Sequence, residues 1–177
     1  MATSNTTQIL IDTTKIAVIK RVGIFDASGG NELQTVMIDP RTLSGLLNAN
    51  GAPYQTGNTL PAGFGANCLS IKKIIYNVDS EVGHLQMKWQ GDIAANDKTI
   101  VALGGAAGGD TNPNDNLPVI TNNAGQPTGN ITIQTVGTTA NAAYTLIIEL
   151  HKNNQYYNAG QFNDPAAFNY PPYGTTP

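Results

Sequence analysis

The side chains best suited to chemistry are few in this sequence, and they stand far apart. His84 and His151 are the two histidines, and Cys68 is the single cysteine, which excludes an intrachain disulfide. A nucleophilic or zinc site needs such groups at short spacing, yet Glu-x-x-His, His-x-His and Gly-x-Ser-x-Gly do not occur. We therefore expect no enzyme, no catalytic, cofactor-binding or metal-binding residues and no cofactor, and we assign both histidines to surface positions.

One loop has a partial likeness to a calcium-binding loop. Asp110, Asn112 and Asn114 place oxygen ligands at alternating positions, as calcium requires. The position that an EF-hand gives to glycine holds Asp115, and the twelfth position, which needs a bidentate glutamate, holds Thr121. An EF-hand is therefore excluded. A looser calcium site stays open, and a turn-rich loop is the preferred interpretation.

The run GGAAGG at 104–109 has the glycine content of a phosphate-binding loop. Such a loop ends in Gly-Lys-Ser/Thr and leads into a helix, whose first N–H groups bind the phosphate. This run lacks that ending, and no helical pattern follows it. We interpret residues 104–116 as a flexible loop.

The composition favours a structural or assembly role over catalysis. The chain has 177 residues, a formal net charge of −3 and 12% charged residues, against about 25% in typical soluble domains. Its sequence pI is about 5.1, and the nine Lys and Arg residues form no basic patch, which argues against nucleic-acid binding. Asn and Thr number 20 each and Gly 19. No stretch of 18 apolar residues or signal-peptide pattern is present, so we expect no membrane partner.

The pattern of β-branched runs and turn residues predicts an all-β fold. Strands are expected over residues 15–25, 34–39, 68–78, 84–91, 99–103, 117–121, 129–137 and 143–152. With about eight strands and no alternation of strands and helices, we predict a single β-sandwich of jelly-roll or Greek-key type with one short helix. The sandwich domain should span 15–151, between an N-terminal arm (1–14) and an extended aromatic C-terminal tail (152–177).

Alternation along three strands indicates which side chains face the core. Residues 15–25 are apolar on both faces, which is typical of a strand between two layers. Residues 84–91 alternate cleanly and should form a hairpin with 68–78 that has one face in water. The expected core residues are Leu85, Met87, Trp89, Leu146, Ile148 and Leu150.

Residues 40–49 predict the short helix. Asp39 can cap its first N–H groups, Pro40 suits the first helical position, and Gly51 follows its end. Its leucines would form one apolar face that closes an open end of the sheet. The loop at 50–68 is long, and loops of this length often serve function or lie against a partner.

The two ends of the chain carry the expected interface anchors. In the N-terminal arm these are Ile9, Leu10 and Ile11. In the tail the anchors are aromatic and interleaved with Pro and Asn, which suits an extended peptide on a neighbour: Tyr156, Tyr157, Phe162, Phe168 and Tyr170. Stacking of exposed aromatics on sugars is the alternative interpretation.

Three blocks of sequence carry a resemblance to a known group of proteins. They are IAVIKRVGIFD (16–26), LSIKKIIYNVDSEVGHLQMKWQG (69–91) and AYTLIIELHKNNQYYNAGQFNDPAAFN (143–169). Over roughly residues 5 to 170 the chain resembles small virion structural proteins of tailed bacteriophages, especially phages of marine cyanobacteria. The resemblance implies assembly in the host cytoplasm and a cofactor-free role in a head, neck or tail. It assigns no functional residues.

We therefore expect a capsid decoration (cement) protein that bridges and stabilises major capsid subunits. Its partners would be the major capsid protein and copies of itself, as a dimer or trimer on the capsid surface of the virion. The first alternative is a structural protein of the neck, tail or fiber base. The second alternative, from a different class, is a carbohydrate-binding module for host attachment.

Overall fold

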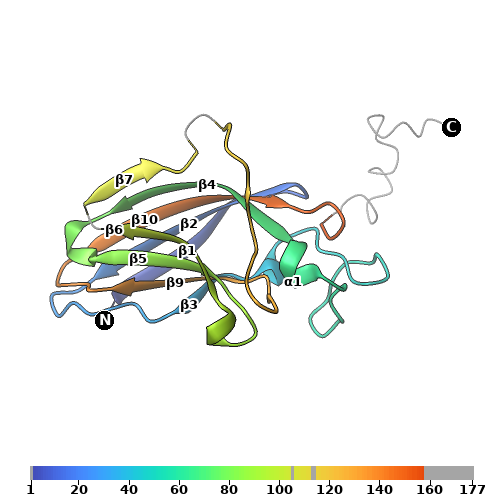
Figure 1. Cartoon of the computed structure of the whole chain (residues 1–177), viewed down its shortest axis with the longest axis horizontal. Helices are drawn as coiled ribbons and strands as arrows, with labels where there is room; N and C mark the ends of the chain where they lie inside the picture. The colour runs from blue at the N-terminus through green and yellow to red at the C-terminus, as the bar shows by residue number, and fades with distance from the viewer. Residues whose placement is uncertain (1, 105, 113–114, 158–177) are drawn as a thin grey trace.

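The chain folds into two antiparallel sheets that face each other, which confirms the all-β sandwich (Figure 1). The computed structural model describes residues 2–104, 106–112 and 115–157. Within these residues a six-stranded sheet has the order β1-β2-β10-β4-β7, with β8 also paired to β4. A four-stranded sheet has the order β3-β9-β5-β6.

The strands lie close to the positions that the sequence pattern predicted. Their bounds are β1 Ala2–Asp12, β2 Ile16–Phe25, β3 Thr35–Ile38, β4 Leu69–Val78, β5 His84–Trp89, β6 Lys98–Gly104, β7 Ala107–Asp110, β8 Ile120–Thr121, β9 Ile131–Val136 and β10 Ala143–Lys152. The helical elements are all short: η1 Pro40–Thr42, α1 Phe64–Asn67, η2 Ser80–Val82 and η3 Ala94–Asn96.

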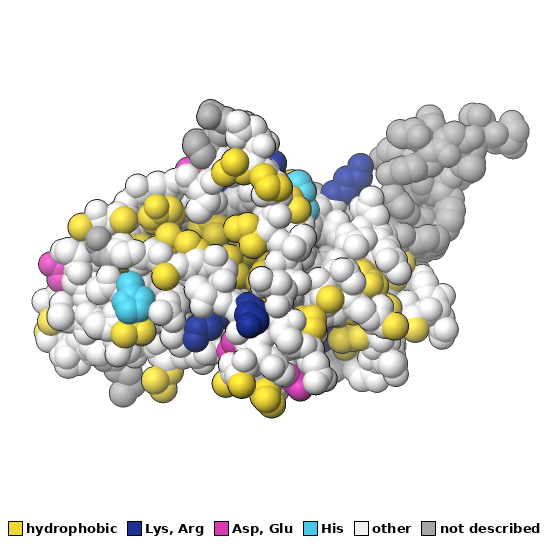
Figure 2. Space-filling model, in the orientation of Figure 1, with side chains coloured by type: hydrophobic (Ala, Val, Ile, Leu, Met, Phe, Trp, Pro, Cys, Tyr) yellow, Lys and Arg dark blue, Asp and Glu magenta, His cyan; other side chains and the backbone are white. Residues whose placement is uncertain are grey.

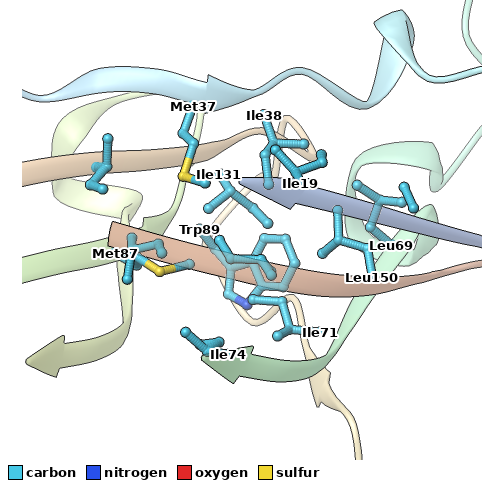
Figure 3. Packing of buried hydrophobic residues seen from close by; sticks show 14 of the residues in the cluster. Ile19, Met37, Ile38, Leu69, Ile71, Ile74, Met87, Trp89, Ile131 and Leu150 are labelled. Atoms are coloured by element: carbon cyan, nitrogen blue, oxygen red, sulfur yellow. The ribbon is translucent and has the colours of Figure 1, made fainter. Parts of the chain in front are cut away.

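The core lies between the two sheets and is centred on Trp89. Its ring lies among Met87 of its own strand, Ile131 of β9 and Ile71 of the opposite sheet (Figure 3). All six core residues that alternation predicted are buried, as the burial of large apolar side chains requires. The fold therefore rests on the inner faces of β5, β9, β10 and β4.

The predicted hairpin between residues 68–78 and 84–91 was wrong. β4 pairs with β10 in the six-stranded sheet, whereas β5 pairs with β6 and β9 in the other sheet. The turn between them, η2 followed by Gly83 at φ 71°, carries the chain from one sheet to the other. A connection between two layers and a hairpin turn have the same local composition, so the pattern did not separate them.

The predicted helix at 40–49 is much shorter in the structure. Asp39 caps its start as expected, accepting a hydrogen bond from the Arg41 N–H, but η1 ends at Thr42. Leu43, which follows it, is already extended at φ −81° and ψ 141°, and Gly45 adopts the left-handed φ of 85° two residues later. The helix that does form, α1, lies inside the segment that was predicted to be a long loop. Four residues are too few to show helical periodicity.

Two segments expected to be arm or loop are strands. Residues 2–12, predicted as an arm that might add a short strand, pair along β2 over their full length as β1. Residues 107–110, predicted as part of a flexible loop, form β7 and pair with β4. Glycine has low strand propensity, so sheet pairing rather than side-chain preference defines β7.

Candidate interaction surfaces

The side chains singled out for chemistry are separated in the structure. His84 lies on β5 and His151 on β10, in different sheets, and both are partly exposed. Cys68 is buried, and burial raises the pKa of its thiol from 9.0 to about 12. The described part of the chain contains no group of three or more His, Cys, Asp or Glu side chains placed to hold a metal.

Side-chain contacts hold the described residues on either side of positions 113–114, and Asn114 itself lies outside the described residues. The Lys73 ammonium lies 3.1 Å from the Asp110 carboxylate and 3.6 Å from that of Asp115. The Asn112 amide donates to the Lys72 and Leu117 carbonyls and accepts from the Leu117 N–H. These contacts describe a turn-rich loop tied to β4.

The four-stranded sheet has a largely polar outer face, on which Val36 and Val136 are the large exposed apolar side chains. The outward side chains of β5 are His84, Gln86 and Lys88, and Gln134 of β9 donates a 2.7 Å hydrogen bond to Gln86. Gln86 in turn lies 3.0 Å from the His84 ring nitrogen. Figure 2 views the molecule from this side and shows mostly polar surface over β5 and β9. This arrangement is typical of an antiparallel sheet that packs one face on the core and exposes the other to solvent.

Apolar side chains cover part of the outer face of the six-stranded sheet, among charged and polar ones. Strand register places these outward side chains in neighbouring rows: Ile11 lies opposite Val18, and Ile147 lies opposite Ile75. We use the term apolar outer face for the set Ile11, Val18, Val22, Ile24, Ile75 and Ile147. Ile11, Ile24 and Ile75 are 44%, 50% and 42% exposed. The charged side chains on this face are Lys20 of β2, Glu149 of β10, Lys73 of β4 and Asp110 of β7; Lys73 lies opposite Glu149, and Asp110 lies opposite Ile75.

Strand β2 carries the clearest signal of this surface. Its inner side chains, such as Ala17, Ile19 and Phe25, are buried, whereas its outer positions are partly or fully exposed. The prediction that this strand lies between two layers was wrong within this chain, because one face alone is covered. A strand that is apolar on both faces is typical of burial on both faces. The apolar outer face is therefore a candidate binding surface for another protein.

The N-terminal anchor residues lie at the edge of the same sheet. Ile9, Leu10 and Ile11 belong to β1 and are 47%, 45% and 44% exposed. A shift of register between Ile9 and Ile11 marks a bulge in this strand. Their role as interface anchors stays a prediction.

The tail anchors Tyr156 and Tyr157 were predicted wrongly, because both are buried in the domain's own core. The Tyr157 hydroxyl donates a 2.8 Å hydrogen bond to the Pro40 carbonyl, and burial raises the pKa of that phenol. Tyr156 packs edge-on against Phe64 of α1, with ring centroids 5.5 Å apart. The extended tail thus cannot begin at residue 152, and Phe162, Phe168 and Tyr170 lie outside the described residues.

A buried lysine ties the end of β10 to the start of the fold. The Lys152 ammonium pairs with the Asp12 carboxylate and donates to the Thr13 and Ser44 carbonyls at 2.7 and 2.8 Å. Burial lowers the pKa of Lys152 despite this carboxylate. Lys152, predicted as the first residue of the tail, is therefore part of the core.

A buried polar network, which sequence reasoning missed, crosses the inner face of the six-stranded sheet. The Arg21 guanidinium pairs with the Glu32 carboxylate and donates a 2.7 Å hydrogen bond to the Thr7 hydroxyl. The Tyr144 hydroxyl donates to the second Glu32 oxygen at 2.5 Å. In the sequence, only Arg21 indicated this network, because it interrupts an otherwise apolar strand face. Glu32 stands in a turn-rich segment, where nothing in the pattern predicts burial. The side chains of Arg21, Glu32 and Tyr144 are all buried.

A cleft beside α1 has a volume of about 730 Å³. Asp92, Gln126, Thr128 and Asn130 line it together with apolar residues. A sugar-binding surface would present an exposed aromatic ring, but all aromatic side chains of the described chain are buried or partly buried. Figure 2 shows a separate gathering of hydrophobic side chains at the opening between β6 and β7.

Comparison with protein families finds no match for this chain, and comparison with curated proteins finds none either. Among solved structures, a cupin superfamily protein from Desulfitobacterium hafniense aligns at 6% identity over 86% of this chain and 80% of that chain, with a TM-score of 0.27. Within the described residues no helix is both long and apolar enough to cross a membrane.

Proposed function

We propose that this protein is a virion structural protein of a tailed bacteriophage that decorates the capsid. Each copy would contact the major capsid protein through the apolar outer face and bridge neighbouring capsid subunits. Its place would be the capsid surface, after assembly in the host cytoplasm. The proposal involves no catalysis and no cofactor.

The apolar outer face is the observation that carries this proposal. Exposed β-branched side chains are stabilised when another protein covers them, because burial of apolar surface contributes about 25 cal/mol per Å². The low content of charged residues, 12%, agrees with a chain that covers much of its surface with other proteins. The resemblance of the sequence to small phage virion proteins is the reason for proposing a phage capsid as the partner.

Copy number in purified particles tests this proposal. Quantitative mass spectrometry against the major capsid protein should give a simple stoichiometry, such as one copy per capsid subunit or one per three. About a dozen copies per particle would move the protein to the neck, tail or fiber base. Absence from particles would contradict the virion proposal altogether.

Glycan binding is the outcome that would favour the alternative class. The described residues offer no exposed aromatic platform, so we expect no binding to a glycan array by the full chain. Saturable binding that is lost on Asn130→Ala in the cleft, with capsid binding absent, would replace the decoration proposal by a carbohydrate-binding module.

A further inference from the structure

Strand β1 is an open edge of the six-stranded sheet. It pairs with β2 on one side and with no other strand of the described chain. All residues from Ser4 to Ile11 are exposed. Along a free edge, alternate backbone N–H and C=O groups point outward without a strand to receive them.

The other edge strands of the described chain are shorter than β1. β3 and β7 have four residues each, and β7 ends at Asp110, which pairs with Lys73. β6 begins with Lys98. Short length and edge lysines are the usual devices against unwanted strand pairing. β1 has 11 residues, contains no proline and carries no charge before Asp12.

The central part of β1 is regular enough to accept a second strand. From Ser4 to Ile9 its register with β2 is unbroken, and shifts of register flank this run on both sides. Six residues of antiparallel strand span about 20 Å. Such a run offers a straight ladder of backbone groups between two bulges.

We propose that β1 pairs with β1 of a second copy of this chain, antiparallel and across a twofold axis. In this arrangement each strand lies opposite itself, so any charge in its centre would meet the same charge. Residues Ser4–Ile9 contain only uncharged side chains and meet no such repulsion. A highly charged partner strand would find no complementary charge there.

Symmetry also explains how the open edge is limited to two copies. A twofold interface uses the same patch on both subunits and closes after one pairing, so no edge is left to recruit a third copy. The two six-stranded sheets become one continuous sheet, and their apolar outer faces lie side by side. The dimer is argued from β1 alone and does not depend on the capsid proposal.

Sedimentation equilibrium of the full chain tests the dimer, which is the species we expect at micromolar concentration. Thr6→Lys places two like charges near the twofold and should raise the dimer dissociation constant about tenfold or more. Thr6→Val keeps the strand uncharged and should leave the dimer intact. Ala102→Lys, on the exposed edge strand β6, is the control for added charge elsewhere. A monomeric wild-type chain, or a dimer indifferent to Thr6→Lys, would overturn the proposal.

Cysteine cross-linking locates the axis. Side chains opposite each other in an antiparallel pair share a face, so the twofold must fall on one residue. We would place single cysteines at Asn5, Thr6, Thr7 and Gln8 in separate variants, since buried Cys68 does not compete. Oxidation should link the two chains strongly at one position. Equal or absent cross-linking at all four would overturn the interface, whereas particle binding by a monomeric variant would leave the capsid proposal standing.

Discussion

The two sheets share one core but differ in the side chains that they turn toward it and away from it. The four-stranded sheet turns Gln86, Lys88 and Gln134 outward and apolar side chains inward. The six-stranded sheet buries Arg21 and Lys152 on its inner face, whereas the outward positions of its strand β2 are largely apolar. The first sheet has the polarity expected of a sheet with one face in water, and strand β2 of the second has the two largely apolar faces expected of a strand between two layers. Under the proposed function, another protein would form the second layer over the apolar outer face.

We expect the largest effect on stability from the buried polar network on the inner face of the six-stranded sheet. Glu32→Ala leaves the buried Arg21 guanidinium without its carboxylate and the Tyr144 hydroxyl without its acceptor. Removal of one partner of a buried ion pair costs about 3–5 kcal/mol, measured as free energy of unfolding in urea. Glu81→Ala, at an exposed carboxylate bonded to Ser80, is the matched control and should cost under about 0.5 kcal/mol. Equal losses for the two variants would show that the network does not stabilise the inner face.

A change in the apolar outer face should weaken binding to capsids and leave the stability of the fold unchanged. Val22→Lys places a charge in the apolar outer face and should weaken binding to capsids about 100-fold, or about 2.7 kcal/mol. Gln134→Lys makes the same charge at a similarly exposed position on the other sheet and should leave binding unchanged. Both variants should melt close to wild type. Weaker binding for Gln134→Lys than for Val22→Lys would reverse the assignment of the two faces.

The buried acids near the six-stranded sheet predict loss of stability in alkali. Cys68 has its pKa raised to about 12, and the pKa values of Tyr144 and Tyr157 are raised, all through burial. The unfolded chain releases these protons first, so stability is intact below pH 9 and falls as the pH rises above it. The lowered pKa of Lys152 acts in the opposite direction.

A single variant isolates one of these acids. For the Cys68 thiol alone, the free energy of unfolding should fall by about 1.4 kcal/mol per pH unit above its ordinary pKa. Cys68→Ala should therefore show a shallower decline between pH 9 and 11 than the wild-type chain in chemical unfolding. Parallel declines would mean that the thiol titrates alike in both states.

We expect the smallest effect on stability from removing the hydroxyl groups of Tyr156 and Tyr157, which were predicted as interface anchors and are buried in the core. Tyr157→Phe removes the hydroxyl that donates to the buried Pro40 carbonyl and should cost about 1 kcal/mol in urea unfolding. Tyr156→Phe removes a longer bond, 3.3 Å to the Ala62 carbonyl, and should cost less. Neither change should alter capsid binding. A binding loss without a stability loss would restore these tyrosines as interface anchors.

Alternation explains why much of the fold was predictable. Residues 84–91 and 143–152 alternate strictly, and their inner side chains are buried as expected. The connection between β4 and β5 was not predictable, because turn composition does not say whether the next strand joins the same sheet. The helix predicted at 40–49 ends at Thr42, although the leucines expected to form its apolar face are buried. β7 depends on its partner β4 and not on its own glycine-rich residues.

The candidate surfaces were visible in the sequence to a lesser degree. The apolar character of both faces of 15–25 was apparent, but its explanation needed the structure, which covers one face alone. Glu32 and Tyr144 are 112 residues apart in the chain, so nothing local linked them. The tail aromatics were treated as one group, although Tyr156 and Tyr157 belong to the core.

Hydroxyl-radical footprinting of the free and the capsid-bound protein tests the central claim most directly, since it reads both outer faces at once. The apolar outer face should be protected on the capsid, with Ile24 and Ile75 the most informative side chains because they are 50% and 42% exposed in the free chain. His84 and Lys88, on the polar face, should react equally in both samples. Protection of His84 and Lys88, with Ile24 and Ile75 still reactive, would contradict the account.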